Sequence, residues 1–342
     1  MADSTARGRF VWHELITPNG TGAREFYKST LGWNTQAWEH DKSYSMFVAP
    51  SGPLGASIES RDGVPQWVPY VGTNEVEATV QEATRRGASV KTPATSIANG
   101  GTYAILTDPQ GATFGVHRGP ASETAYQVAA PKYGEFSWHE LATTEQPGVP
   151  FELYSSLFGW EKISEFDMGS AGIYLIFGLN GVQLGGMFNK GEMGKPGPGY
   201  WVSYVRVKNV NDTVDRVKGA RGSLLNGPME VPGGDWIAQL ADPHGAFFAV
   251  HVLAVDVKGA AAPAAKSAAA PATKKAAETK PAKKKAAKKV TKKAGKKKAA
   301  KKKAAKKVAK KKGGKKKQAK GKRPAPKKMK AAKARKKKAK RR

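Results

Sequence analysis

The residues of this chain best suited to chemistry are histidines and glutamates that occur twice in the same local sequence. FVWHEL at 10–15 returns as FSWHEL at 136–141, and DPQGATFGVH at 108–117 returns as DPHGAFFAVH at 242–251. Three pairs result: His13 with His139, Glu14 with Glu140, and His117 with His251. Two histidines and a carboxylate can bind a transition metal, and either residue type can serve as a general acid or base. We therefore take Glu14, Glu140, His117 and His251 as candidate catalytic residues.

Strand geometry limits which of these side chains can act together. Neighbouring residues of a strand point to opposite faces, so His13 and Glu14 cannot reach the same ion unless a bulge intervenes. One face carries Phe10, Trp12, Glu14 and Ile16, and the other carries Val11, His13, Leu15 and Thr17. We expect His13 to pack against a helix layer, with a ring nitrogen hydrogen-bonded to backbone. His117, on the last strand of its repeat, is the better histidine for a pocket.

A carboxylate between Trp12 and Ile16 is costly to bury without a partner, so Glu14 has two interpretations. It is a general base or hydrogen-bond acceptor with a raised pKa, or a structural carboxylate satisfied by backbone amides or by Arg24. The first interpretation predicts an aromatic pocket in each repeat that accepts a small apolar or aromatic ligand. Its predicted lining is Trp12, Glu14 and Trp67 in the first repeat, and Trp138, Glu140 and Trp201 in the second. The tryptophans could equally belong to the core.

These side chains must be positioned by two copies of one fold, at 9–118 and 135–253, joined by a linker at 119–134. Hydrophobic periodicity in the first copy predicts two successive βαβββ units. The predicted elements are a strand at 10–17, a helix at 22–31, strands near 33–38, 44–49 and 55–59, then a strand at 67–71, a helix at 76–86 and strands near 89, 103 and 114. The DPxG sequences are turn formers and should join the last two strands of each copy as hairpins.

Paired βαβββ units with an early FY…GW and a late DPxG resemble the vicinal oxygen chelate superfamily, which includes glyoxalase I, bleomycin and fosfomycin resistance proteins and extradiol dioxygenases. The motifs W-x-E-L, FY…FGW, LGG and W-V-x-Y-V look like those of two-domain actinobacterial-type glyoxalase-like proteins. The resemblance covers about 9–253. It implies an α+β fold of two tandem glyoxalase-like domains, in which the paired βαβββ units form a curled mixed sheet.

The resemblance also implies a divalent metal in the curled sheet, but this chain departs from the ligand pattern. The positions of the usual ligands fall on Trp12, Trp67 and Gly115 in the first copy and on Trp138, Trp201 and Ala249 in the second. None of these side chains can bind a metal. Glu59, His117 and His251 are the remaining metal candidates. We predict that the complete family metal site is lacking, although a divalent metal cofactor is still possible.

The end of the chain has a different composition from the rest. Residues 258–342 hold 40 of the 59 Lys and Arg residues and one of the 27 acids, which leaves 19 bases and 26 acids before them. A segment almost entirely of Lys, Ala, Pro and Gly cannot bury enough apolar surface to fold. We expect disorder at 1–8 and in a basic tail at 254–342, whose composition resembles linker-histone tails.

A flexible polycation releases the counterions of DNA when it binds, so we expect the tail to bind DNA without sequence preference. Runs of lysine are the predicted contacts: Lys283, Lys284, Lys285, Lys296, Lys297, Lys298, Lys301, Lys302, Lys303, Lys315, Lys316, Lys317, Lys336, Lys337 and Lys338. RNA, polyphosphate and an anionic membrane are alternative partners.

Several classes of protein are excluded or disfavoured by composition. The chain has no cysteine, which excludes disulfides, thiolate ligands and a cysteine nucleophile. It has no apolar run long enough to span a membrane and no apolar segment at its start. We expect a cytoplasmic protein, associated with the nucleoid if it is bacterial. No Ser, His and Asp spacing indicates a hydrolase.

These observations lead to one hypothesis and two alternatives. The hypothesis is a glyoxalase-like protein that binds a small molecule and is tethered to DNA by its tail. The first alternative is a metal-dependent lyase, oxygenase or hydroxylase that uses His117 or His251 with Glu14 or Glu140. The second is an architectural nucleoid protein. Whether the chain is an enzyme at all is left open by the sequence.

Overall fold

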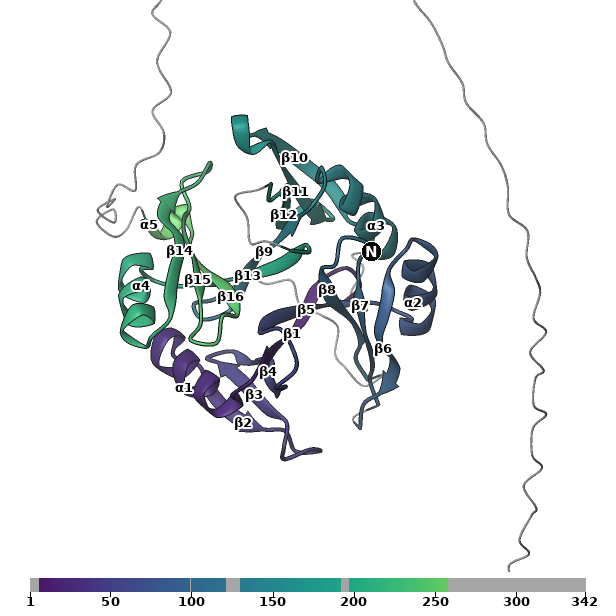
Figure 1. Ribbon diagram of the computed structural model, residues 1–342, viewed down its shortest axis with the longest axis horizontal. Helices are drawn as coiled ribbons and strands as arrows, with labels where there is room; N and C mark the ends of the chain where they lie inside the picture. The colour runs from purple at the N-terminus through teal and green to yellow at the C-terminus, as the bar shows by residue number, and fades with distance from the viewer. Residues whose placement is uncertain (1–5, 99, 121–129, 192–196, 258–342) are drawn as a thin grey trace, which may run out of the picture. The chain divides into compact units, whose positions relative to one another are not determined.

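The structure, a computed structural model, describes residues 6–98, 100–120, 130–191 and 197–257. Each repeat forms one eight-stranded mixed sheet with two long helices (Figure 1). The first repeat contains β1 (Phe10–Thr17), α1 (Gly20–Leu31), β2 (Asn34–Ala37), β3 (Ser45–Ala49), β4 (Gly52–Glu59), β5 (Gln66–Gly72), α2 (Val76–Arg85), β6 (Ser89–Ser96), β7 (Thr102–Thr107) and β8 (Thr113–Arg118). The second contains β9 (Phe136–Thr143), α3 (Gly148–Phe158), β10 (Glu161–Asp167), the 3-10 turn η1 (Gly169–Ala171), β11 (Ile173–Leu179), β12 (Val182–Asn189), β13 (Tyr200–Arg206), α4 (Val210–Gly219), β14 (Ser223–Glu230), β15 (Trp236–Ala241), β16 (Phe247–Val252) and α5 (Ala254–Val257).

The strand order shows how two βαβββ units make each sheet. The first sheet runs β2-β3-β4-β1-β5-β8-β7-β6, and the second has the same order in its own strands. The central pair β1 and β5 is antiparallel, whereas β1 is parallel to β4 and β5 is parallel to β8. The prediction of an α+β fold of two tandem domains, each built from paired βαβββ units in one mixed sheet, is therefore confirmed.

The helices and turns form for the local reasons read from the sequence. Asn19 begins α1, because its side chain accepts a hydrogen bond from the Gly22 amide at 2.9 Å, and Gly32 ends it in the left-handed region. In the first DPxG turn the Gly111 amide donates to the Asp108 carbonyl at 3.0 Å, and the turn joins antiparallel β7 and β8 as predicted.

A β-bulge near the start of β1 changes one predicted face. The register against β5 shifts between Phe10 and Trp12, so Val11 is the extra residue. Phe10 consequently points to the same side as His13, where its ring stacks on His139 with centroids 3.6 Å apart. The assignment of Phe10 to the Trp12 and Glu14 face is wrong for this reason, and the second sheet has the same shift at the start of β9.

The two repeats share their hydrophobic cores. Helix α1 of the first repeat contacts α4 of the second, and α2 contacts α3 (Figure 1). One buried cluster joins Phe26 of α1 to Phe248 of β16, and the other joins Phe114 of β8 to Tyr154 of α3. These two larger clusters therefore take residues from both halves, whereas a third, small cluster around Tyr204 lies within the second repeat.

Hydrogen bonds between buried polar groups also join the two repeats. The Tyr27 hydroxyl donates to Asp242 at 3.4 Å, and Tyr154 donates to Asp108 at 3.0 Å. The tyrosine of FY in the first copy and of LY in the second is thus paired with the DPxG turn of the other copy. Because these groups are buried, separating the halves would leave them without partners.

The end of the described region differs from the expected start of the tail. Ala254–Val257, which the sequence places in the tail, form the short helix α5, and Asp256 pairs with Arg206 at 2.9 Å. Residues 258–342, with all the predicted DNA-contacting lysines, lie outside the described residues, as does most of the predicted disordered start. Among the residues that are described, no helix is both long and apolar enough to cross a membrane.

Candidate functional site

The carboxyl group of Glu14 is held by tyrosines from neighbouring strands. Tyr44, just before β3, donates to Oε1 at 2.7 Å, and Tyr70 of β5 donates to Oε2 at 2.5 Å. Trp12 donates in turn to the Tyr44 hydroxyl at 2.9 Å. The suggested partners, backbone amides or Arg24, are not the ones found, because Arg24 donates instead to Ser57.

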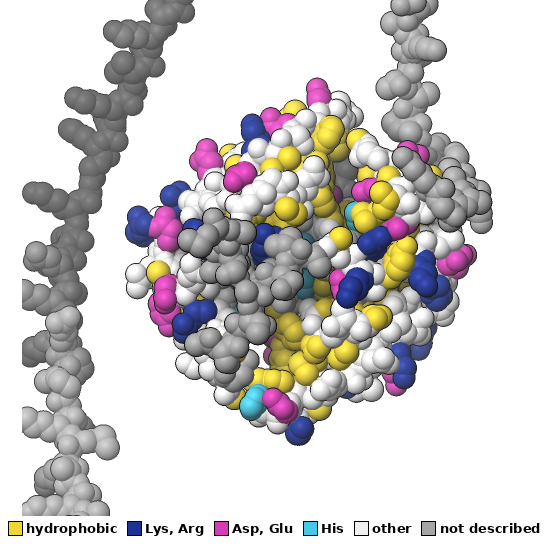
Figure 2. Space-filling view, turned by 180° about the vertical axis from the view of Figure 1, so that it is seen from behind, with side chains coloured by type: hydrophobic (Ala, Val, Ile, Leu, Met, Phe, Trp, Pro, Cys, Tyr) yellow, Lys and Arg dark blue, Asp and Glu magenta, His cyan; other side chains and the backbone are white. Residues whose placement is uncertain are grey.

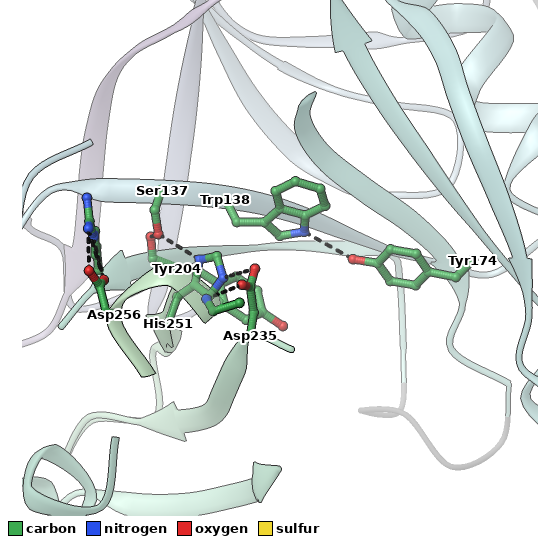
Figure 3. A network of polar contacts seen from close by, with 9 residues as sticks. Ser137, Trp138, Tyr174, Tyr204, Asp235, His251 and Asp256 are labelled. Atoms are coloured by element: carbon green, nitrogen blue, oxygen red, sulfur yellow. Dashed lines mark hydrogen bonds and ion pairs between the residues drawn. The ribbon is translucent and has the colours of Figure 1, made fainter. Parts of the chain in front are cut away.

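Glu140 has the same arrangement with one additional donor. Tyr174 donates to Oε1 at 2.8 Å, while Tyr204 and Gln239 donate to Oε2 at 2.8 and 2.9 Å. Trp138 donates to Tyr174 at 3.1 Å, as Figure 3 shows. Burial raises the pKa of Glu140, and the hydrogen bonds from Tyr204, Tyr174 and Gln239 oppose that rise. Burial likewise raises the pKa of Glu14.

Glu140 lies on the wall of a cavity of about 340 Å³. The strands place it there because Trp138, Glu140 and Ala142 alternate onto one face of β9, opposite Val202 and Tyr200 of β13. The cavity is mainly apolar. Its polar lining includes the carboxyl group of Glu140 and the side-chain amides of Asn226 and Gln239. The remaining lining residues are Ala142, Phe188, Tyr200, Val202, Leu225, Leu240, Phe247 and Phe248.

The first repeat carries different residues at the positions of this cavity wall. By the repeat alignment, Lys91 stands where the second repeat has Leu225, Thr113 where it has Phe247, and Ile105 where it has Gln239. Lys91 Nζ donates to the Thr113 hydroxyl at 3.3 Å. Two apolar wall residues of the second repeat are therefore replaced by a hydrogen-bonded polar pair in the first.

Two of the tryptophans predicted to line the pockets lie elsewhere. Trp67 and Trp201 are on the face of the sheet opposite to Glu14 and Glu140, where they are 2% and 5% exposed. Trp67 donates to the Tyr27 hydroxyl at 2.9 Å, and Trp201 donates to Tyr154 at 3.3 Å. The structure thus places this pair in the core between the repeats and keeps Trp12 and Trp138 beside the glutamates.

His13 and His139 meet each other between the two sheets. Their Nε2 atoms are 2.8 Å apart, so one ring donates and the other accepts. The carbonyl of Leu54 lies 3.4 Å from Nδ1 of His13, which agrees with the expected backbone contact, but the ring stacks on Phe136 of β9 in the other repeat, where a helix layer was expected. Burial lowers the pKa of His13 to about 3, and burial with the neighbouring His13 lowers that of His139.

The last-strand histidines, His117 and His251, differ in their surroundings. Both occupy the face of their sheets on which Gly115 and Ala249 lie. Burial lowers the pKa of His117. His251 lies between Ser137 and Asp235 (Figure 3), with its Nδ1 3.1 Å from the Ser137 hydroxyl and its Nε2 2.9 Å from Asp235.

The residues present do not match the metal site that the family resemblance implies. Trp12, Trp67 and Gly115 supply no ligand atom, and Glu59 accepts a hydrogen bond from the Gly20 amide at the start of α1. Across the part of the chain that the structure describes, no group of three or more His, Asp or Glu side chains could hold a metal ion.

Sequence reasoning missed the partners of the glutamates and of His251. Tyr70 and Tyr204 are repeated in the W-V-x-Y-V motif, and Tyr44 and Tyr174 also correspond, so repetition of a tyrosine was a usable signal. Gln239, Ser137 and Asp235 occur in the second repeat alone. No repeat signal could have identified them.

Comparisons with known proteins agree with this fold. No family model matches the chain. The chain is 26% identical over 253 residues to CFP32 of Mycobacterium tuberculosis, provisionally named a glyoxylase, with 70% of this chain and 92% of the relative covered. It is 26% identical over 265 residues to the anthracycline biosynthesis protein DauV of Streptomyces sp. strain C5, with 72% and 93% covered.

Among solved structures, the Mn(II)-bound glyoxalase of Novosphingobium aromaticivorans superposes with a TM-score of 0.53 at 14% identity, covering 72% of this chain and 82% of that one. At this identity the likeness concerns the fold alone. It shows that the two repeats have the fold of that glyoxalase, as two tandem glyoxalase-like domains.

Proposed function

We propose that the second of the two vicinal-oxygen-chelate-fold domains binds a small aromatic molecule that carries a hydrogen-bond donor. The cavity beside Glu140 is lined mainly by apolar and aromatic side chains, which favour a ligand with an apolar body. A carboxylate has about four acceptor positions, and three donors occupy those of Glu140. One position remains on Oε1, and it suits a ligand hydroxyl or N–H group.

The single observation that carries this proposal is the buried carboxyl group of Glu140 in an apolar cavity. An anionic ligand would be repelled by ionised Glu140, whereas a phenol or an amine would gain a charge-assisted hydrogen bond. The name of the relative DauV, an anthracycline biosynthesis protein, supports an aromatic ligand.

The test compares two probes with the same aromatic body, 2-naphthol and 2-methoxynaphthalene, by calorimetry on the full chain. We expect 2-naphthol to bind on the order of tenfold more tightly, because only it can donate to Glu140. Glu140→Gln should remove that difference, and the corresponding Glu14→Gln change should not. Equal binding of both probes, no binding of either, or an undiminished preference in Glu140→Gln would contradict the proposal.

For residues 258–342 the proposal is a sequence-independent tether to DNA. Its support is charge: 40 Lys and Arg residues against one acid, attached to a body with more acids than bases. Figure 2 shows acidic and basic side chains interspersed on the visible face of the body, without one dominant sign.

The tether is tested by measuring DNA affinity against salt. If about ten lysines contact phosphates, the logarithm of affinity should fall with a slope of about −9 against the logarithm of salt concentration. Replacing the fifteen predicted contact lysines with glutamine should make the slope shallower. A slope unchanged by those substitutions would contradict the tether.

Metal-dependent lyase, oxygenase or hydroxylase chemistry is the alternative for the body. The name of CFP32 as a glyoxylase supports it, and the residues at the family ligand positions oppose it. Elemental analysis of the purified chain decides: near-stoichiometric Fe, Mn, Ni or Zn would favour the alternative.

A further inference from the structure

Ser137, His251 and Asp235 form a continuous hydrogen-bonded chain at the start of β9, outside the Glu140 cavity (Figure 3). The Ser137 hydroxyl is 3.1 Å from Nδ1 of His251, and Nε2 of the same ring is 2.9 Å from Asp235. His251 is 6% exposed, whereas Ser137 is half-buried. None of the three lines the cavity.

The proton positions follow from what each group can donate. The hydrogen bond from His251 holds the pKa of Asp235 below its usual value, so this carboxylate is ionised and only accepts. The ring therefore donates through Nε2, and in the neutral ring the Nδ1 lone pair then faces Ser137. A second contact of the hydroxyl, to the Tyr204 carbonyl, is longer at 3.3 Å.

Asp235 is fixed by more than the histidine. Its other oxygen accepts a hydrogen bond from the Ala254 amide at 2.6 Å, so the carboxylate has a defined orientation. A serine next to a histidine that a third group orients is the arrangement by which proteins activate a hydroxyl nucleophile.

The first repeat provides an internal comparison. His117 corresponds to His251, but Val11 stands where the second repeat has Ser137, and Gly101 stands where it has Asp235. The first repeat nevertheless forms the same eight-stranded sheet with a bulge at the same place. The fold therefore does not require the serine or the aspartate, and their presence in the second repeat needs another explanation.

We propose that Ser137 is a nucleophile that takes acyl groups from small activated esters, with His251 as its base and Asp235 as the residue that orients the base. Ser137 Oγ forms a bond to the ester carbonyl carbon, and its proton moves to Nδ1 of His251. The carbon–oxygen bond to the leaving group then breaks, and the leaving oxygen takes the proton from Nδ1. Water hydrolyses the acyl-serine by the same proton transfers, which releases the carboxylic acid and restores Ser137.

The test is labelling of the full chain with a fluorophosphonate probe, followed by peptide mass spectrometry. We expect a stoichiometric adduct on Ser137 that is absent from Ser137→Ala. Asp235→Asn and His251→Gln should slow labelling on the order of a hundredfold or more, because the base is then misoriented or missing. His117→Gln, the matched change in the first repeat, should label at the rate of the unchanged protein.

Hydrolysis of p-nitrophenyl acetate gives a second readout with the same expected order of variants. Circular dichroism identifies any variant that does not fold. If a base variant does not fold, the comparison of labelling between the unchanged protein and Ser137→Ala still tests whether Ser137 is the nucleophile. No adduct on Ser137 in the unchanged chain overturns the proposal. An adduct that forms equally fast in folded Asp235→Asn or His251→Gln also overturns it, because Ser137 would then react without a base.

Discussion

At the scale of single residues, the repeated glutamate has different surroundings in the two domains, because Glu14 is half-buried and Glu140 is buried. Glu14 accepts hydrogen bonds from two tyrosines, and Glu140 accepts from two tyrosines and Gln239. In both cases every donor favours the ionised form, whereas burial favours the neutral form. The net rise in the pKa of both groups means that burial has the larger effect.

Glu140 should make the folded protein less stable as pH rises. A folded-state pKa above the unfolded value means that the unfolded chain releases this proton first, so stability falls as pH increases through and above about 4.5. Glu140→Gln cannot ionise and should lose that dependence. Urea unfolding between pH 4 and 8 measures it, and parallel curves for the two proteins would contradict the assignment.

Tyr204→Phe should destabilise the second domain by about 1–3 kcal/mol, because Oε2 of Glu140 loses one of its two donors while it stays buried. Tyr70→Phe is the matched variant, and it removes the one donor that the described residues provide to Oε2 of Glu14. Denaturant titration gives both values. A cost near zero for Tyr204→Phe would mean that water replaces the lost hydroxyl.

At the scale of elements, strands β1 and β9 meet through one histidine each. The two rings are buried against each other and stack on Phe136 and Phe10 with centroids 3.7 and 3.6 Å apart. Each phenylalanine comes from the other repeat and reaches its partner ring because of the bulge that precedes the histidine. The contact therefore depends on backbone irregularities in two strands.

Acid should weaken this contact. Burial lowers the pKa of His13 to about 3, so the unfolded chain binds a proton that the folded chain excludes, and stability is lost as pH falls below about 6.5. At pH 5 the loss from His13 amounts to about 2 kcal/mol. Unfolding of His13→Gln, measured over the same pH range, should show a smaller loss. An equal loss of stability in His13→Gln would show that another group causes the pH dependence.

The elements themselves could be predicted because their signals are local. The periodicity of α1, the alternation in β1 and the DPxG turns all depend on residues close in sequence. The face of Phe10 could not be predicted, because a bulge is set by the register of β1 against β5. The placement of Trp67 in the core likewise depends on Tyr27 and on the other repeat, and no local pattern encodes it.

At the scale of the whole molecule, the described body is two sheets with cores that neither repeat completes alone. Tyr27 needs Asp242, Tyr154 needs Asp108, and α1 packs against α4. Buried groups shared in this way make separate unfolding of one repeat costly. The body should therefore unfold in a single transition.

A double-mutant cycle tests that shared core. Tyr27→Phe and Asp242→Ala should each destabilise the protein, and their combined effect should fall short of the sum by about 0.5–3 kcal/mol. Fluorescence and circular dichroism should report the same midpoint for every variant. Strict additivity, or two separated transitions, would show that the repeats are energetically independent.

Because each repeat completes the core of the other, their contact also limits which substitutions the duplicated sequence can accept. A substitution in the contact between the two copies affects both of them. The second copy accordingly has the same residue types at the positions that correspond to His13, Tyr27 and Asp108. Substitutions on the sheet faces that carry Glu14 and Glu140 need not be matched in the other copy. There the copies differ, as at Ile105 and Gln239. The duplicated chain therefore has one contact region in which the two copies must match, and two sheet faces that can each acquire a different ligand.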